Sequence, residues 1–201
     1  TAFLSIISTL IVRMNPTKYS EKELLRQISK GEAEAKHLVY KQYIRYLSAV
    51  CSRYVGNDED IKDVLQESFL KIFSSLTSFT YQGEGSLKAW MSRIVVNESL
   101  KWLKKNARLE TTAFSDNEMD IPDEEPDTEG VPTDVIYQMI RSLPDGYRTV
   151  FNLFVIEERS HREIAEMLGI KESSSASQLH RAKAMLAEKI TQFRKERTLT
   201  K

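Results

Sequence analysis

The chain has 201 residues, of which 41% are hydrophobic and 29% charged, with 29 basic and 29 acidic side chains. This length allows one large domain or two small ones, and the composition is typical of a folded protein rather than a disordered one. A single cysteine, Cys51, excludes an internal disulfide framework and a zinc site built from thiolates, and no glycine-rich phosphate-binding motif occurs.

The first fifteen residues differ from the rest in their apolar character. The stretch from residue 2 to residue 12 is too short to span a membrane as a helix, and it lacks the basic start and cleavage site of a signal peptide. We interpret residues 1–15 as an N-terminal extension in which Met14 is the natural start and residues 1–13 lie upstream of it, with a short amphipathic arm as the alternative. We therefore expect a cytoplasmic protein.

Residues 16–107 form the first predicted domain. Ser20 and Glu23 have the spacing of a capping box, which predicts a helix start. Apolar residues at helical spacing predict helices from Ser20, over 32–54, over 58–75, and from Ser86, a candidate cap, to about residue 106. Residues 78–85 interrupt this pattern and predict a loop.

Residues 108–133 carry the strongest local charge. One basic and ten acidic side chains lie between residues 108 and 134, a net charge of −9, whereas the flanking segments carry +5 and +4. The segment contains three prolines and few large apolar residues, which predicts a flexible acidic linker. Basic segments around an acidic one favour a nucleic acid or another polyanion as partner, with ordinary solvated surface as the alternative.

Residues 134–201 form the second predicted domain, again helical, so the chain is predicted to be all-α. Helices are expected over 134–142, from Pro144 to about 156, after Ser160 and over 172–195. Ser160 and Glu163 repeat the capping-box spacing, and Gly169 suits a left-handed turn. A short helix, a glycine turn and a second helix predict a helix-turn-helix, with a plain helical hairpin as the alternative.

The second domain resembles a known family. The sequence SHREIAEMLGI from Ser160, SQLHRAK from Ser177 and LPDGYRTVF from Leu143 resemble the −35-reading region 4 of bacterial sigma factors of the extracytoplasmic-function (ECF) class. The second helix of such a domain enters the major groove. The predicted −35 contacts are Arg162, Ser173, Ser174, Ser175, Ser177, Gln178, His180, Arg181 and Lys183. The family often has basic residues where this chain has Ala176 and Gln178, which indicates a different −35 preference or weaker electrostatic binding.

The first domain carries an independent resemblance. The sequence DIKDVLQESFLKIF, which begins at Asp60, resembles the region 2 helix that docks on the clamp of RNA polymerase. Asp60, Asp63 and Glu67 recur on one helix face, and Gln66 lies beside them. The resemblance implies that these four residues bind core polymerase. Without it, a solvated helix face is the expected meaning of such a stripe.

The loop and helix that follow imply a −10 DNA site. Residues 79–84 correspond to the family loop that captures a flipped −10 base, which requires aromatic groups to replace base stacking. The next helix matches the family pattern of a tryptophan followed by Arg-Ile and an asparagine. The predicted −10 contacts are Phe79, Tyr81, Trp90, Arg93, Asn97, Lys101, Lys104 and Lys105. For Trp90, packing in the protein wall is the alternative to stacking on DNA.

Together the resemblances imply an ECF sigma factor with a region 2 domain, an acidic linker and a region 4 domain. Such a protein binds core RNA polymerase, directs it to specific promoters and assists strand opening, without a catalytic site, metal or cofactor of its own. The implied partners are core polymerase, duplex −35 DNA, partly single-stranded −10 DNA and an anti-sigma factor, with no membrane insertion and no small-molecule substrate. We interpret the acidic linker as a mimic of nucleic acid in the RNA path of the polymerase, with a plain spacer as the alternative. A stand-alone helix-turn-helix regulator and a degenerate sigma-like interaction protein are the alternative functions.

Overall fold

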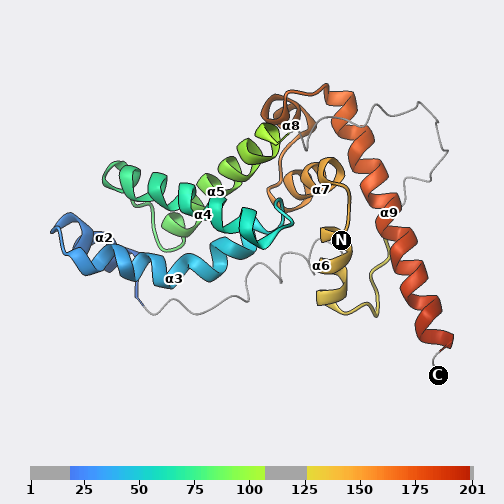
Figure 1. Ribbon diagram of the computed structural model, residues 1–201, viewed down its shortest axis with the longest axis horizontal. Coiled ribbons are helices and arrows are strands. Elements are labelled where there is room, and N and C mark those ends of the chain that lie inside the picture. The colour runs from blue at the N-terminus through green and yellow to red at the C-terminus, as the bar shows by residue number, and fades with distance from the viewer. Residues whose placement is uncertain (1–18, 107–125, 200–201) are drawn as a thin grey trace. The chain divides into compact units, whose positions relative to one another are not determined.

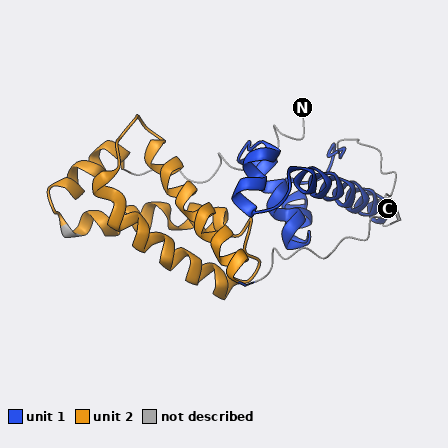
Figure 2. Cartoon of the chain, turned by 90° about the horizontal axis from the view of Figure 1, so that it is seen from above, with its two compact units in different colours: residues 1–13, 106–201 blue, residues 14–105 orange. Residues whose placement is uncertain are grey.

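The computed structural model describes residues 19–106 and 126–199, and it shows helices joined by turns and loops (Figure 1). Within these ranges there is no strand, as the all-α prediction requires. The chain divides into two compact units at Lys105 and Asn106 (Figure 2). We call residues 19–105 the N-terminal unit and residues 126–199 the C-terminal unit. The predicted N-terminal extension and most of the predicted linker lie outside the described residues.

The N-terminal unit is a helical bundle. Its elements are α2 (Glu21–Ser29), α3 (Ala33–Cys51), α4 (Asp58–Ser75), a 3-10 turn (Leu76–Ser78) and α5 (Ser86–Lys105). The predicted helices are confirmed, and α4 has the predicted bounds. The Asn57 side chain accepts a hydrogen bond from the Glu59 N–H at 2.8 Å, which explains why α4 begins where it does. Tyr43, Leu47 and Met91, from the contacting helices α3 and α5, are fully buried in the core.

The start of α2 differs in part from the capping-box prediction. Ser20 Oγ accepts a hydrogen bond from the Glu23 N–H at 3.2 Å, as predicted. The Glu23 carboxylate, however, accepts two hydrogen bonds from Arg26, at 2.6 and 2.8 Å. These bonds to the guanidinium lower the pKa of Glu23 to about 2. The side chain of Glu23 therefore stabilises the exposed face of α2.

The start of α5 also differs from the prediction. Ser86 is the first helical residue rather than the cap before it, and its hydroxyl donates to the carbonyl of Gly83 at 2.6 Å. The next two backbone N–H groups, of Leu87 and Lys88, each donate to the carboxylate of Glu21 at 2.9 Å. The cap of this helix is thus supplied by α2, which is distant in sequence.

The C-terminal unit contains the predicted helix-turn-helix. Its elements are α6 (Thr133–Arg141), α7 (Asp145–Phe151), a π-helical turn (Asn152–Ile156), α8 (His161–Leu168) and α9 (Glu172–Leu199). Both halves of the second capping box form, because the Glu163 N–H donates to Ser160 Oγ and the Ser160 N–H donates to the Glu163 carboxylate. Gly169 has a φ of 73°, which confirms the predicted left-handed turn between α8 and α9.

The turn between α6 and α7 is held by a buried arginine. The Arg148 guanidinium donates to the carbonyls of Arg141 and Leu143, at 2.9 and 3.1 Å, and to the Asp145 carboxylate at 2.6 Å. Carbonyls at a helix end have no partner within the helix, so a cation that binds them stabilises the turn. This geometry explains why the LPDGYRTVF segment contains an arginine at this position.

The last residues of the predicted linker belong to the C-terminal unit. Thr128 and Val131 are buried. Arg194 of α9 donates to the Asp127 carboxylate at 2.9 Å, to the Asp127 carbonyl at 3.2 Å and to the Glu129 carbonyl at 2.8 Å. Residues in the range 126–133, which the sequence prediction assigned to the linker, therefore pack against the C-terminal unit.

Candidate nucleic-acid interface

An acidic face lies on the exposed side of α4. Asp63, Gln66 and Glu67 are exposed, and Asp60 is half-buried. The opposite side of the helix is buried through Ile61, Val64, Leu65, Ser68, Phe69 and Ile72. The structure therefore brings the four predicted polymerase-binding residues onto one face, and their binding role stays a prediction.

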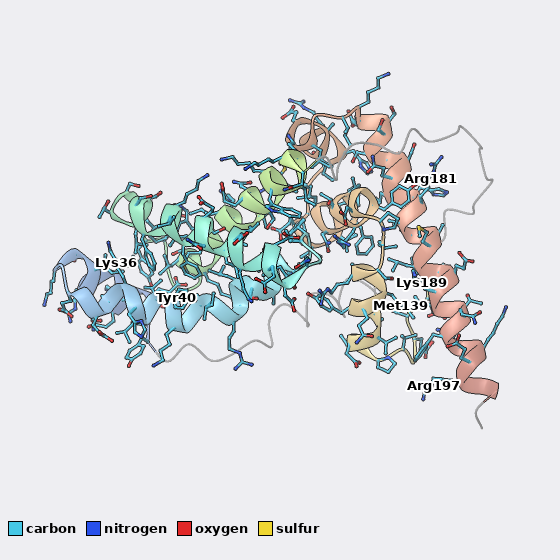
Figure 3. The ribbon with its side chains drawn as sticks, viewed as in Figure 1. Lys36, Tyr40, Met139, Arg181, Lys189 and Arg197 are labelled. Atoms are coloured by element: carbon cyan, nitrogen blue, oxygen red, sulfur yellow. The ribbon has the colours of Figure 1, made fainter. Side chains whose placement is uncertain are left out.

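Sequence analysis missed one residue of this face. Leu70 is 59% exposed, and it follows Gln66 by four residues and Glu67 by three, so it lies beside them on the helix. The neighbouring helix α3 presents Tyr40, which is 42% exposed (Figure 3) and whose ring centroid lies 4.8 Å from that of Phe69. Leu70 lies on the side of α4 opposite the buried apolar residues. An apolar residue outside the apolar periodicity of the helix is the signal that identifies Leu70 from sequence.

The predicted −10 loop presents two aromatic side chains. The ring centroids of Phe79 and Trp90 are 5.0 Å apart with the rings tilted by 43°, and both residues are half-buried. The Tyr81 hydroxyl donates to the Glu84 carboxylate at 3.4 Å, and desolvation together with that charge raises the pKa of Tyr81. Trp90 of α5 packs against Phe79, a contact that is compatible with the wall role, and its contact with −10 DNA stays a prediction.

A basic stripe continues along α5. Its members, all exposed, are Arg93, Asn97, Lys101, Lys104 and Lys105. Their spacing of about four residues places them on one side of the helix, and the opposite side is buried in the core. The acidic residue of this stretch, Glu98, is half-buried and forms an ion pair with Lys71 of α4. The stripe therefore offers four cations and one amide, groups that suit phosphates and base edges.

The helix-turn-helix exposes part of the predicted −35 set. Ser173, Ser177 and Arg162 are exposed, whereas Ser174, His180, Arg181 and Lys183 are half-buried. Ser173, Ser177 and Arg181 are spaced by four residues and therefore share one side of α9. Arg162 of α8 forms an exposed ion pair with Glu166 at 3.4 Å.

Two residues of the predicted −35 set lie inside the domain. Ser175 is fully buried, and its hydroxyl lies 3.0 Å from Nδ1 of His161, whose ring stacks on Phe154. Gln178 is 8% exposed and packs against the start of α7, where a Cβ at Gly146 would meet its Oε1 at 3.3 Å. Both side chains fix α9 to its neighbouring helices, so their burial argues against the predicted DNA contacts of Ser175 and Gln178, which stay predictions.

Other kinds of site find no support within the described ranges. No group of three or more His, Cys, Asp or Glu in residues 19–106 and 126–199 is arranged to hold a metal ion. No helix in these ranges is both long enough and apolar enough to cross a membrane. Burial raises the pKa of Cys51 to about 11, and the Ser99 hydroxyl lies 3.5 Å from its Sγ. This thiol is a core group rather than a nucleophile.

The two units match two regions of one protein family. Sigma-70 region 2 matches residues 39–109, which carry the acidic face and the basic stripe. Sigma-70, region 4 matches residues 133–186, which carry the helix-turn-helix. Together the two matches cover more than half of the chain, in the order that the sequence predicted.

Curated relatives match along most of their length. The ECF RNA polymerase sigma-E factor of Haemophilus influenzae is 28% identical over 184 residues, which cover 85% of this chain and 95% of that protein. The RNA polymerase sigma factor YlaC of Bacillus subtilis is 29% identical over 164 residues, which cover 79% of this chain and 93% of that protein. The chain belongs to the sigma-70 family, in its ECF group.

Two solved structures are also similar. CnrH in complex with the cytosolic domain of CnrY has 22% identity and a TM-score of 0.44, covering 84% of this chain and 95% of that chain. The sigma factor RpoE in complex with the anti-sigma factor NepR, from Bartonella quintana, has 18% identity and a TM-score of 0.45, covering 79% and 98%. At these TM-scores the likeness carries no functional argument.

Proposed function

We propose that this chain is a dissociable promoter-specificity subunit of bacterial RNA polymerase, an initiation factor rather than an enzyme. The observation that supports this most directly is that one chain combines the acidic face of α4 with the helix-turn-helix of α8 and α9, each exposed to solvent. A regulator that acts without polymerase needs only the second of these surfaces.

The acidic face of α4 is the proposed polymerase surface. Asp63 and Glu67 suit a basic partner. The exposed Leu70, about one turn after Glu67, adds an apolar contact. Interfaces of this kind combine a desolvated apolar anchor with charged groups that steer the encounter.

Promoter DNA is the proposed partner of the other two surfaces. In the N-terminal unit, Phe79 and Tyr81 replace stacking for unpaired −10 bases, each worth roughly 1–3 kcal/mol, while the cations of α5 bind phosphates. In the C-terminal unit, Ser173, Ser177 and Arg181 face the −35 duplex. The proposed −35 set thus excludes the buried Ser175 and Gln178.

An anti-sigma factor is the proposed regulatory partner. One similar structure is that of a sigma factor bound to an anti-sigma factor. In this chain, a protein that covers the acidic face of α4 would compete with polymerase for binding, and one that covers the basic stripe of α5 would compete with −10 DNA.

Reconstituted transcription tests the proposal. The full chain is added to purified bacterial core polymerase with genomic DNA, and the 5′ ends of transcripts are sequenced. We expect discrete start sites that share two upstream motifs. Core binding without discrete starts indicates a degenerate interaction protein, and stable duplex binding without core binding indicates a stand-alone regulator.

Charge reversal on α4 tests the polymerase surface. We expect Asp63→Lys with Glu67→Lys to lower core affinity roughly 100-fold, because about 1.4 kcal/mol is lost at each reversed contact. The matched control is Glu32→Lys with Glu34→Lys, which makes the same charge change at the exposed start of α3. Equal losses in both double variants, with helicity retained, contradict the assignment of this face.

A further inference from the structure

Glu21 is the one buried acidic side chain in the described ranges, with 1% exposure. Its Oε2 accepts the Leu87 N–H at 2.9 Å, and its Oε1 accepts the Lys88 N–H at 2.9 Å and the Tyr43 hydroxyl at 3.2 Å. Backbone N–H groups at a helix start have no partner within the helix, and the helix dipole there favours a negative charge. The carboxylate from α2 therefore satisfies the start of α5, 66 residues away.

Glu84 performs the reverse role for α2. Both of its carboxylate oxygens accept the Glu21 N–H, at 3.2 and 3.3 Å, and Glu21 is the first residue of α2. Tyr81 donates to the same carboxylate. Glu21 and Glu84 thus cap each other's neighbouring helix start, and we call this pair with its donors the carboxylate lock.

The carboxylate lock contacts the −10 loop and the helix start that follows it. Residues 79–85 precede α5 directly, and Gly83 and Gly85 have φ values of 119° and 92°, which only glycine adopts readily. Backbone of this kind has many alternative conformations unless contacts from elsewhere select one. The lock supplies such contacts at Tyr81, at Glu84 and at the first turn of α5.

The lock is anchored to the bundle. The Tyr19 N–H donates to Gln42 Oε1, and Gln42 Nε2 donates to the Tyr19 carbonyl, both at 3.0 Å. Together with the hydroxyl of Tyr43, these bonds fasten the start of α2 to α3. The −10 loop is therefore held against α2, and α2 is in turn held against α3.

We propose that Glu21 is a positioning residue for −10 recognition, and that the carboxylate lock holds the loop of residues 79–85 in its base-capturing arrangement before DNA arrives. This inference rests on the proposed function. A preorganised loop loses less conformational entropy when it captures a base, so the lock raises both strand opening and discrimination at the captured position. Glu21 itself touches no DNA.

The Glu21→Gln variant of the full chain tests this inference. An amide keeps the size of the side chain but offers one acceptor oxygen, and its NH₂ group faces a backbone donor. We expect roughly tenfold fewer transcripts from a duplex promoter, corresponding to about 1.4 kcal/mol. We also expect a similar loss of discrimination against a changed −10 base, with core affinity unchanged. A template already open at −10 restores most of the transcription.

Glu23→Gln is the matched control, because Glu23 lies on the same helix and binds Arg26 and Gln27 instead of the loop. Hydrogen exchange at Leu87 and Lys88 provides a second readout that needs no promoter, and it is expected to accelerate in Glu21→Gln alone. A folded Glu21→Gln protein that keeps wild-type −10 discrimination overturns the inference, because the carboxylate lock then stabilises the fold without positioning the loop for DNA. Absence of discrete starts with the wild-type chain instead overturns the proposed function, and the inference with it.

Discussion

Arg148 illustrates how a charged side chain is accommodated inside the C-terminal unit. It is 5% exposed, and two carbonyls and one carboxylate accept its hydrogen bonds. We expect Arg148→Ala to lower the free energy of unfolding by about 3–5 kcal/mol, because it removes a buried side chain whose three buried or half-buried acceptors lose its hydrogen bonds. Urea unfolding of the full chain, followed by circular dichroism, measures the loss.

Arg162→Ala is the control for this prediction. Arg162 forms an ion pair with Glu166 in which both side chains are largely exposed, so its removal is expected to change the unfolding free energy by less than about 0.5 kcal/mol. Equal effects of the two substitutions would show that burial does not determine the contribution of Arg148.

Cys51 makes a residue-scale prediction about pH. Its thiol is neutral in the folded chain up to about pH 11, whereas the thiol of an unfolded chain ionises near pH 9. Because only the unfolded state releases the proton in this interval, stability falls as pH rises from about 9 to about 11, by roughly 2–3 kcal/mol. Unfolding measured against pH for wild type and Cys51→Ala tests this, and the variant is expected to lack this part of the slope.

At the scale of elements, α9 combines two roles that are separable by substitution. Ser175→Ala removes the hydrogen bond to His161 and is expected to cost about 1 kcal/mol of stability while leaving −35 preference unchanged. Ser173→Ala is expected to do the reverse, because Ser173 is exposed. Transcription from a library of randomised −35 sequences checks both. A changed base preference in Ser175→Ala contradicts the structural role.

Sequence reasoning succeeded for elements whose ends depend on local chemistry. The start of α4 at Asp58, the capping box at Ser160 and the turn at Gly169 each depend on residues a few positions apart, so the sequence alone predicts them. It failed where the partner is distant in sequence. Glu21 caps α5, and Gln178 packs against α7, and neither contact leaves a periodic signal in the chain.

The same distinction explains the candidate site. The exposed face of α4 and the stripe on α5 follow from helical periodicity, so their residues were predicted together. The burial of Ser175 follows from its contact with His161 of α8, which the periodicity of α9 does not contain. Which serines of a recognition helix are exposed can therefore be determined only from the packed domain.

At the scale of the whole molecule, the structure shortens the segment that joins the two units. Residues 126–133, which the sequence assigned to the linker, lie in the C-terminal unit. Eight residues correspond to roughly 27 Å of extended chain, so the maximal reach between the units is smaller by that length.

Attachment of this segment depends on Arg194, and this makes a final prediction. Three hydrogen bonds join Arg194 to Asp127 and Glu129, so Arg194→Ala should let the segment detach more often. A protease that cuts after glutamate should then cleave the bond after Glu129 roughly tenfold faster, because cleavage follows the population of the open form and about 1.4 kcal/mol is lost.

Arg197→Ala is the control, because Arg197 lies one turn further along α9 and contacts the Phe193 ring instead. Its cleavage after Glu129 should remain at the wild-type rate. If Arg194→Ala also cleaves at that rate, then the buried Thr128 and Val131 hold the segment without the arginine. In that case apolar packing, rather than charge, fixes where the linker ends and the helix-turn-helix unit begins.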